Sequence, residues 1–569
     1  MNAKDLPPST WTTGSTEVFK TGTWRTLLPQ YIKAPSPCHA ACPVDGNIAE
    51  WIGKARSRDF RGAWEILTSN NPFPAVAGRI CHHPCEAACN RAGFDESLAI
   101  CRLERHVGDL AIEHGWGYAQ IPISHPETIA VVGGGPSGLS VAYHLRRRGY
   151  AVTIFEASGE LGGLMRHGIP AYRLARPVLD AEIARVLALG IEARLGSALG
   201  STESLAELRA QFDIVYLAMG ARQQKRLPQL DYSRPWVMDG AVYLAASNAG
   251  APPRLGKKLI VIGGGSAAID AARSARRAGH DVTLMSLETA EQMPAQHEEV
   301  AEALEEGIEL CSGAMITAAA EDGDAVSLSC VRVDFRPGAV RGEFTVEPVP
   351  GSEFTLRADG VIPSIGQDPD LAPLKDELDA NGRLVKVDAT QATSAEGVYA
   401  GGDVASMARF VTEAIGMGKR AAKEIDRVLR AADPETVRDI AAAAGSGQVA
   451  AEVAEAGEAV VGLKQISTFY YPQQERAAEQ RLGVEERLRS DAEVQIGFDL
   501  DQALAETERC FSCGTCVYCD NCFHYCPDLA IRRLPERGGY EVLTDFCKGC
   551  GVCVGECPTG SMKMVEDAR

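Results

Sequence analysis

The stretch TIAVVGGGPSGLSVAYHLRRRGYAVTIFE at residues 128–156 decides the fold of the central part of the chain. Residues 128–132 are a short apolar run that predicts a β-strand, and a glycine-rich turn, a helix over 139–148 and a second strand that ends at an acid follow. This order is the dinucleotide-binding fingerprint, because the glycines let the backbone approach a pyrophosphate at the helix N-terminus and the acid bonds a ribose hydroxyl. The expected contact residues are Gly133, Gly135, Pro136, Ser137, Gly138 and Glu156.

The same plan returns about 130 residues later, with a strand over 258–262, a glycine turn, a helix and a strand over 281–285. The third fingerprint position is Ala268, a variant that the pattern allows. Two copies at this separation predict an FAD domain with a nicotinamide domain inserted into it. The expected contacts of the second site are Gly263, Gly265, Ser266 and Ala267.

Two further motifs complete the expected flavin site. The run LGGL at 161–164, with Gly163 and Leu164, is similar to FAD-binding disulfide-reductase-like folds, and GVYAGGD at 397–403 resembles the closing FAD motif of that superfamily. The resemblance implies that Asp403, after Gly402, bonds the ribityl chain. Residues 359–367 are expected to be the strand that returns to the FAD domain. A helix over 412–422 would point its N-terminus, with its partial positive charge, at the flavin.

The overall composition is that of an acidic globular protein. Hydrophobic residues make up 45% and charged residues 23%, and the formal net charge of -19 argues against a general nucleic-acid or anionic-membrane binder. No apolar run approaches the roughly 20 residues of a membrane span, and the first residues lack the apolar core of a secretory signal. We therefore expect a cytoplasmic protein in which the 18 cysteines bind metal rather than form disulfides.

Ten of these cysteines lie between Cys510 and Cys557. The segments CVYCDNCFHYCP at 516–527 and CKGCGVCVGECP at 547–558 both match the bacterial ferredoxin run, in which the fourth cysteine binds the other cluster. One predicted 4Fe-4S cluster has the ligands Cys516, Cys519, Cys522 and Cys557, and the other has Cys547, Cys550, Cys553 and Cys526. A pair of zinc knuckles is the competing interpretation. Cys510 and Cys513 extend the first run backwards, either as a shifted ligand set or, as we expect, as spare thiols.

A second group of cysteines lies between Cys38 and Cys101. Cys81, Cys85 and Cys89 recur at intervals of four, so they would share one face of a helix. The stretches PCHAACPVDGNIAEW, NPFPAVAGRICHHPCEAAC and LAICRLERHVGD resemble the iron–sulfur domain of the glutamate synthase small subunit and of dihydropyrimidine dehydrogenase. The alternative is that these are buried structural cysteines, as we expect for Cys101.

The resemblance implies two clusters in this domain, and the chain departs from it. The family binds the second cluster with two further cysteines upstream of Cys38, but residues 1–37 contain none. We therefore predict one cluster here, with the ligands Cys42, Cys81, Cys85 and Glu104. Cys38 or Cys89 would replace Glu104 if ligation is entirely by thiolates. The expected total is three 4Fe-4S clusters, together with FAD and NAD(H).

The choice of nucleotide depends on the segment after the second strand of the inserted domain. NADP-binding relatives of the small subunit place paired arginines there, whereas this chain has Leu287 and Glu288. A carboxylate repels a 2′-phosphate and can bond the ribose hydroxyls of NAD. Glu288 therefore predicts NAD(H) over NADP(H). The alternative is that Glu288 is a solvated acid and that Arg276 or another residue binds the phosphate.

The expected fold is multidomain, α/β and α+β. The expected units are a helical iron–sulfur domain (1–120), an FAD domain in two parts (121–240 and 355–430), an NAD(H) domain (241–354), a linker or docking segment (431–505) and a two-cluster ferredoxin domain (506–569). The charged run 475–493 within the linker is expected to be solvated. No protein acid or base is needed for hydride exchange, so no catalytic side chain is nominated.

These parts predict a flavoprotein that exchanges hydride between NAD(H) and FAD and moves single electrons through clusters. The expected role is a subunit of a hetero-oligomer whose partner is a 2-oxoacid:ferredoxin oxidoreductase or a glutamate-synthase-like catalytic subunit. The alternatives are a freestanding NAD(P)H:ferredoxin oxidoreductase and a redox-sensing iron–sulfur scaffold. A thioredoxin-reductase-like activity is disfavoured, because Cys311 and Cys330 are isolated in the nucleotide region.

Overall fold

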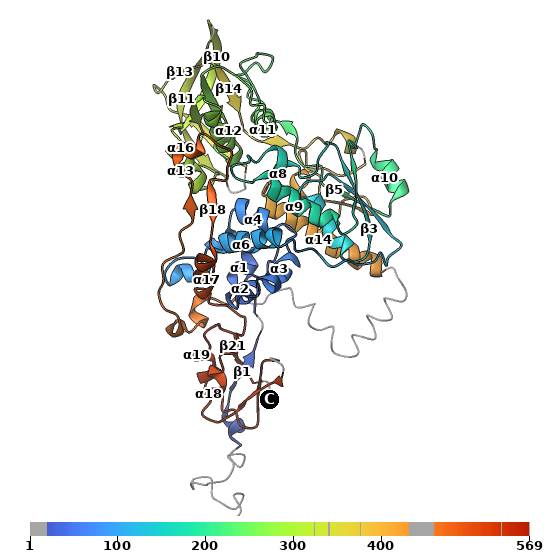
Figure 1. Ribbon diagram of the computed structural model, residues 1–569, viewed down its shortest axis with the longest axis vertical. Helices are drawn as coiled ribbons and strands as arrows, with labels where there is room; N and C mark the ends of the chain where they lie inside the picture. Colours follow the sequence, from blue (N-terminus) through green and yellow to red (C-terminus); the bar gives the residue numbers. More distant parts are fainter. Residues whose placement is uncertain are drawn as a thin grey trace, which may run out of the picture.

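The computed structural model describes residues 20–32, 34–323, 325–338, 342–375, 377–431, 460–535 and 538–567. The domains are named here after the cofactors that the sequence predicts for them. The helical iron–sulfur domain lies at the centre of the molecule, beside the FAD domain, with the NAD domain at one end and the ferredoxin domain at the other (Figure 1). Residues 432–459 of the predicted linker lie outside the described part. None of the helices in the ranges above is long and apolar enough to cross a bilayer.

The FAD domain contains a five-stranded parallel sheet in the order β16-β5-β2-β3-β4. The glycine turn leaves β2 where Val132 pairs with Phe155, at the carboxyl edge of the sheet. Helix α14 packs on α7, the helix of the fingerprint. The elements of this domain are β2 (Thr128–Val132), α7 (Pro136–Arg146), β3 (Ala151–Glu156), α8 (Leu164–His167), α9 (Arg176–Leu187), β4 (Glu192–Leu195), α10 (Leu205–Gln211), β5 (Ile214–Leu217), β6 (Gln223–Gln224), β15 (Gln367–Asp368), β16 (Val398–Ala400) and α14 (Val411–Ala431).

The NAD domain repeats the plan with the parallel order β14-β7-β8-β9 and carries an antiparallel sheet of β10 to β13. Strand β14 pairs with β7 from Gly360↔Leu259 to Pro363↔Ile262. The prediction that residues 359–367 return to the FAD sheet is therefore wrong, because this fully buried strand completes the NAD sheet instead. The elements are α11 (Gly240–Asn248), β7 (Lys258–Ile262), α12 (Ser266–Arg277), β8 (Asp281–Met285), α13 (His297–Glu305), β9 (Glu309–Cys311), β10 (Ala314–Asp322), β11 (Ala325–Pro337), β12 (Phe344–Pro348), β13 (Phe354–Ala358) and β14 (Gly360–Pro363).

The iron–sulfur domain is built from short helices that pack around Trp51 and Trp64, both buried. Its helices are α1 (Pro37–Ala41), α2 (Ile48–Arg56), α3 (Phe60–Thr68), α4 (Pro74–Ile80), α5 (Pro84–Ala87) and α6 (Ile100–Glu113). Cys81 caps α4, and Cys85 lies in α5 after His83, whose φ of 47° breaks the helix. The expectation that Cys81, Cys85 and Cys89 share one face of a single helix is therefore wrong.

The ferredoxin domain takes a strand from the other end of the chain. Strand β1 (Leu27–Tyr31) pairs antiparallel with β21 (Met562–Glu566), from Leu27↔Glu566 to Tyr31↔Met562. The other elements are α18 (Asn521–His524), β19 (Ile531–Arg533), β20 (Tyr540–Val542) and α19 (Val552–Gly555). The predicted unit 1–120 thus contains a strand, Leu27–Tyr31, that belongs to the ferredoxin domain.

A strap, residues 460–509, connects the NAD domain with the iron–sulfur domain (Figure 1). It contains β17 (Gln480–Arg481), α16 (Val484–Arg487), β18 (Gln495–Gly497) and α17 (Leu500–Glu508). Arg487 pairs with Glu305 of the NAD domain at 2.7 Å.

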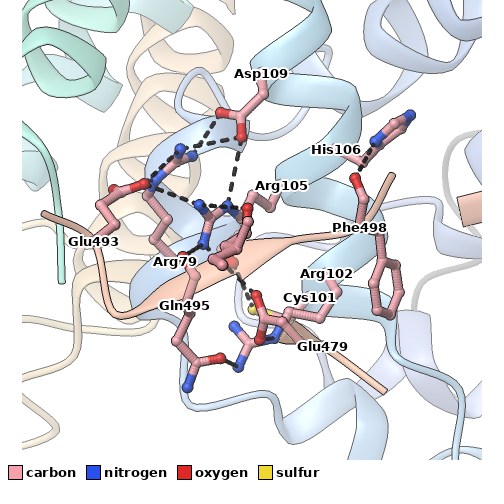
Figure 2. Close-up of polar contacts among 12 residues, drawn as sticks. Arg79, Cys101, Arg102, Arg105, His106, Asp109, Glu479, Glu493, Gln495 and Phe498 are labelled. Atoms are coloured by element: carbon pink, nitrogen blue, oxygen red, sulfur yellow. Dashed lines mark hydrogen bonds and ion pairs between the residues drawn. The ribbon is translucent and has the colours of Figure 1, made fainter. Parts of the chain in front are cut away.

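Two acids of the strap pair with arginines of the iron–sulfur domain (Figure 2). Glu493 accepts hydrogen bonds from Arg79 at 2.6 Å and from Arg105 at 2.9 Å, and Glu479 pairs with Arg102 at 2.5 Å. The expectation of a solvated charged face is wrong for these two acids, because arginines cover them.

Candidate functional site: nucleotide cavity and cysteine clusters

A cavity of about 1130 Å³ lies between the two nucleotide-binding domains. Both fingerprint helices reach it with their first residues, and the carboxyl end of β14 lines the space between them. The predicted contact residues that line the cavity are Gly133, Gly135, Pro136, Ser137, Glu156, Gly163, Leu164, Gly402, Asp403, Ser266 and Ala267. A volume of this size at the carboxyl edge of two parallel sheets fits two dinucleotides.

The glycines of the first turn have the conformation that a pyrophosphate cradle needs. Gly133 has φ of +108°, and a Cβ on Gly138 would lie 1.9 Å from the carbonyl oxygen of Gly133, so helix and strand approach without a side chain. A Cβ on Gly135 or Gly265 would meet no atom closer than 3.9 Å, since both positions face open space. The residues present therefore fit FAD on one side and a nicotinamide nucleotide on the other.

The acids Glu156 and Glu288 lie against the two glycine turns. Glu156 accepts a hydrogen bond from the backbone N–H of Gly134 at 2.7 Å. The carboxylate of Glu288 lies beside Gly264, where an added Cβ would be 2.4 Å from Oε2, and burial raises the pKa of Glu288. Ser286, rather than Glu288, follows β8 at the position that corresponds to Glu156.

The flavin side of the cavity ends at the N-terminus of α14. Val411 and Ala414 of this helix line the cavity with Asp403, whose pKa is raised by burial. The prediction of a helix that points its N-terminus at this space is confirmed, although the helix is longer than expected. The rings of Phe410 and His82 contact each other in a tilted arrangement, with their centroids 4.1 Å apart, which brings the iron–sulfur domain to the edge of the cavity.

The first cysteine cavity is lined by Cys42, Cys81, Cys85 and Glu104, together with Thr412 of α14. Asn71 donates a hydrogen bond to Glu104 at 2.7 Å, and burial raises the pKa of Glu104 to about 8. Burial also raises the pKa of Cys42 to about 11 and that of Cys81 to about 12. Four acidic groups that line one cavity fit a cationic metal cluster, whose binding would release their protons. Ligation by these residues stays a prediction.

A second cavity is lined by Cys38, Cys89, Cys510 and Cys513. The expectation that Cys510 and Cys513 are spare thiols does not match this placement, because both sulfurs adjoin the two N-terminal cysteines. The x2 spacing of Cys510 and Cys513 is typical of cluster ligands, but no pattern in the sequence connects this pair with Cys38 and Cys89. Cys101 is buried as expected, with its thiol against the carbonyl of Gly78 at 3.4 Å.

The ferredoxin cysteines group as the crossed assignment requires. Cys516, Cys519, Cys522 and Cys557 line one cavity. Cys526, Cys547 and Cys550 are the charged neighbours that raise the pKa of Cys553, after burial as the largest cause, to about 12. The fourth cysteine of each run thus lies with the other run.

Within the described residues, no three His, Cys, Asp or Glu side chains converge closely enough to hold a single metal ion. A cubane differs from a single ion because each thiolate binds a different iron atom of a larger core. Cavities bordered by cysteines that face a common space fit the cubane rather than a mononuclear ion such as zinc.

The family profile of pyridine nucleotide-disulphide oxidoreductases matches residues 127–418, more than half of the chain. The chain belongs to the pyridine nucleotide-disulphide oxidoreductase family. This oxidoreductase also matches the dihydropyrimidine dehydrogenase domain II profile with a 4Fe-4S cluster at residues 32–116, and a 4Fe-4S binding domain at 540–563. It is therefore an FAD- and nicotinamide-dependent oxidoreductase with iron–sulfur clusters.

Curated relatives align with most of this chain and with most of their own length. The chain is 35% identical to the NADP(+)-dependent formate dehydrogenase subunit beta of Moorella thermoacetica over 84% of this chain and 70% of that protein. It is 33% identical to the NADPH-Fe(3+) oxidoreductase subunit beta of Geobacter sulfurreducens, over 84% and 75%. It is 31% identical to the NAD-dependent dihydropyrimidine dehydrogenase subunit PreT of Escherichia coli O157:H7, over 70% and 92%.

Proposed function

We propose that this oxidoreductase is the electron-exchange subunit of a hetero-oligomer, connecting NAD(H) to a catalytic partner. The observation that carries the proposal is the position of α14, whose first turn lines both the nucleotide cavity (Val411, Ala414) and the first cysteine cavity (Thr412). A group bound against Val411 is therefore separated from one bound against Thr412 by little more than a helix turn.

FAD, when bound, supplies the conversion between two-electron hydride transfer and one-electron transfer. The residues that line the cavity would hold the two nucleotides side by side, and His82 and Phe410 lie at its edge, where their rings contact each other. Cys42, Cys81, Cys85 and Glu104 would hold the first cluster, and the two crossed cysteine sets would hold the ferredoxin clusters. The ferredoxin domain projects at the far end of the molecule, where a partner can reach it (Figure 1).

NAD(H) is proposed as the nucleotide, although the names of two relatives specify NADP. Glu288 lies against the second glycine turn, where its charge opposes a 2′-phosphate. Arg276 lies at the opposite end of β8, where it donates to the carbonyl of Glu306 at 2.9 Å and faces Asp281 at 3.7 Å. Its guanidinium is thus engaged away from the nucleotide edge.

The experiment is anaerobic purification from the native source, followed by reduction of the bound flavin with NADH or NADPH. A stoichiometric catalytic subunit that co-purifies, and faster reduction by NADH, are the expected results. Full turnover with free ferredoxin and no partner would favour the freestanding oxidoreductase instead. A protein whose flavin neither nucleotide reduces would contradict both and favour a redox-sensing scaffold.

A further inference from the structure

Four cysteines that come from opposite ends of the sequence border one cavity. Cys38 lies in α1, Cys89 precedes a short helical turn at Asn90, and Cys510 and Cys513 follow α17. Apart from these sulfurs the lining is mostly apolar, with Ile48 and Ile52 on one wall. Every cysteine in the described part of the chain is a free thiol, so no disulfide accounts for the grouping.

The size of this cavity matches the cysteine sites already described. Its empty space, which includes space open to solvent, is about 380 Å³, between about 430 Å³ for the cavity of Cys42, Cys81 and Cys85 and about 310 Å³ for the cavity of Cys516. The corresponding figure for the nucleotide cavity is about 3260 Å³. This cavity is similar in size to the Cys516 cavity and is likewise bordered by four thiols. The similarity indicates that it holds the same kind of group, an iron–sulfur cluster.

Buried ion pairs fix the two C-terminal cysteines against the iron–sulfur domain. Arg91 donates to the carbonyl of Arg509 at 2.9 Å and pairs with Asp95, and Arg509 also pairs with Asp95, at 3.1 Å. Glu506 accepts from the backbone N–H of Ala99 at 2.7 Å. These contacts hold residues 506–510 against residues 91–99 of the iron–sulfur domain.

The loop that follows Cys510 and carries Cys513 is also held tightly against the rest of the protein. The amide of Asn90 donates to the carbonyl of Val461 at 2.8 Å and lies 3.4 Å from the sulfur of Cys513. Gly514 has φ of +71°, and a Cβ there would lie 2.0 Å from the carbonyl oxygen of Ala34. The loop that carries Cys513 therefore fits tightly between residues 34 and 90.

We propose that Cys38, Cys89, Cys510 and Cys513 hold a fourth 4Fe-4S cluster. The family resemblance supplies only two of these ligands, and its missing upstream pair is replaced by Cys510-x2-Cys513 from the other end of the chain. Two ligands in x2 spacing wrap one side of a cubane, and the other two close it.

This fourth site lies between the other clusters. Ile48 lines both its cavity and that of Cys42, and Cys38 and Cys42 are one helical turn apart. On the other side Cys513 is three residues from Cys516, a ligand of the ferredoxin cavity. Since electron transfer slows steeply with distance, an occupied fourth site would join the flavin-side cluster to the ferredoxin domain.

The test is the iron and sulfide content of the anaerobically purified full-length protein. Four clusters require about 16 iron atoms per chain, and three require about 12. Cys510→Ala/Cys513→Ala should lose about four irons while keeping its FAD, and Cys38→Ala/Cys89→Ala should lose the same four. The variant with all four substitutions should lose no more than either pair. The matched control, Cys311→Ala/Cys330→Ala, should keep the wild-type iron content.

About 12 irons in the wild type, one bound zinc, or iron content unchanged in both variants would overturn the proposal. The wild-type count decides even if a variant fails to fold. The count is also independent of the proposed electron-exchange function, since iron is measured without nucleotide or partner. In reduced samples, electron paramagnetic resonance should show one cluster signal fewer in Cys510→Ala/Cys513→Ala than in the control.

Discussion

The sulfur of Cys81 lies 3.7 Å from the hydroxyl oxygen of Thr412, although the two residues are 331 positions apart. Cys81 ends the helix α4 of the iron–sulfur domain, and Thr412 lies in the first turn of α14, which also lines the nucleotide cavity. The contact thus joins a predicted cluster ligand to the helix that faces the flavin. If Cys81 is a thiolate, the hydroxyl of Thr412 would donate a hydrogen bond to its sulfur.

Thr412→Val should lower the reduction potential of the cluster held by Cys81. A hydrogen bond to a ligand sulfur stabilises the more negative, reduced cluster, so its loss favours the oxidised form. A net hydrogen bond of about 0.5–1.5 kcal/mol corresponds to roughly 20–60 mV for one electron. Redox titration followed by electron paramagnetic resonance measures the shift. Thr412→Ser keeps the hydroxyl and should stay near wild type; equal potentials in all three proteins would refute the role of the hydroxyl.

Leu287→Arg/Glu288→Arg should shift the nucleotide preference toward NADPH. The change removes a carboxylate beside Gly264 and adds two guanidiniums, each able to make charge-assisted hydrogen bonds to a 2′-phosphate. The ratio of kcat/KM for NADPH over NADH should rise roughly 10- to 100-fold, since such bonds contribute about 1.5–3 kcal/mol. Glu291→Arg reverses an exposed charge nearby and is the control. A wild type that already prefers NADPH would contradict the assignment.

Glu493→Gln should destabilise the joint between the strap and the iron–sulfur domain. Glu493 pairs with Arg79 and Arg105, whose side chains are 4% and 5% exposed, and accepts from the backbone N–H of Ala175. Unfolding free energy should fall by about 3 kcal/mol, because two buried cations lose a partner while Asp109 still neutralises Arg79. Thermal unfolding and limited proteolysis of residues 474–499 measure the effect.

The matched control for this variant is Glu485→Gln in the same strap. Its carboxylate is 88% exposed and faces only Arg489 at 3.7 Å. Surface pairs of this kind contribute little, so the midpoint of unfolding should hardly move. Equal effects of Glu485→Gln and Glu493→Gln would show that the buried cluster is not a structural joint.

Glu182 should make the contact between α4 and α9 weaken as pH rises. The carboxyl is fully buried and accepts from the backbone N–H groups of Ala75 and Val76 at 3.2 and 3.1 Å, and burial raises its pKa from 4.5 to about 7. The pKa of Glu182 is higher in the folded than in the unfolded protein. The protonated carboxyl therefore contributes fully to the free energy of unfolding below pH 4.5, and this contribution is lost as the pH rises to about 7. The loss is about 3 kcal/mol.

The measurement is the midpoint of thermal unfolding at pH 5 and pH 8. Wild type should lose stability between the two values, and Glu182→Gln should lose less, since its amide does not titrate. Glu113→Gln, an exposed position on α6, should behave as wild type. If wild type and Glu182→Gln showed the same decline, the carboxyl would not be its source.

Local sequence patterns predicted the nucleotide-binding parts well. Gly133 and Gly263 both adopt positive φ where the fingerprint requires it, and α14 begins where the Gly402–Asp403 motif implies. The positive φ angles and the start of α14 depend on residues that are close together in the sequence, so a single sequence is enough to predict them. The same holds for the crossed ferredoxin cysteines, whose spacing is set by the cluster.

Contacts between distant segments were not predictable in this way. Strand β14 joins the NAD sheet, Glu493 pairs with Arg79, and Cys510 lies beside Cys38; each depends on packing between segments that no local pattern connects. The charged run 475–493 has the composition of a solvent-exposed segment. The role of its acids Glu479 and Glu493 becomes clear only from the buried arginines with which they pair.

The pairing of β1 with β21 has a consequence for how the protein matures. Leu27 and Glu566 lie 539 residues apart in the sequence, so β1 has a partner strand only after all the residues between them have been made. The β1–β21 pair of the ferredoxin domain therefore forms after the iron–sulfur and nucleotide-binding domains, which lie between the two strands in the sequence, have been made.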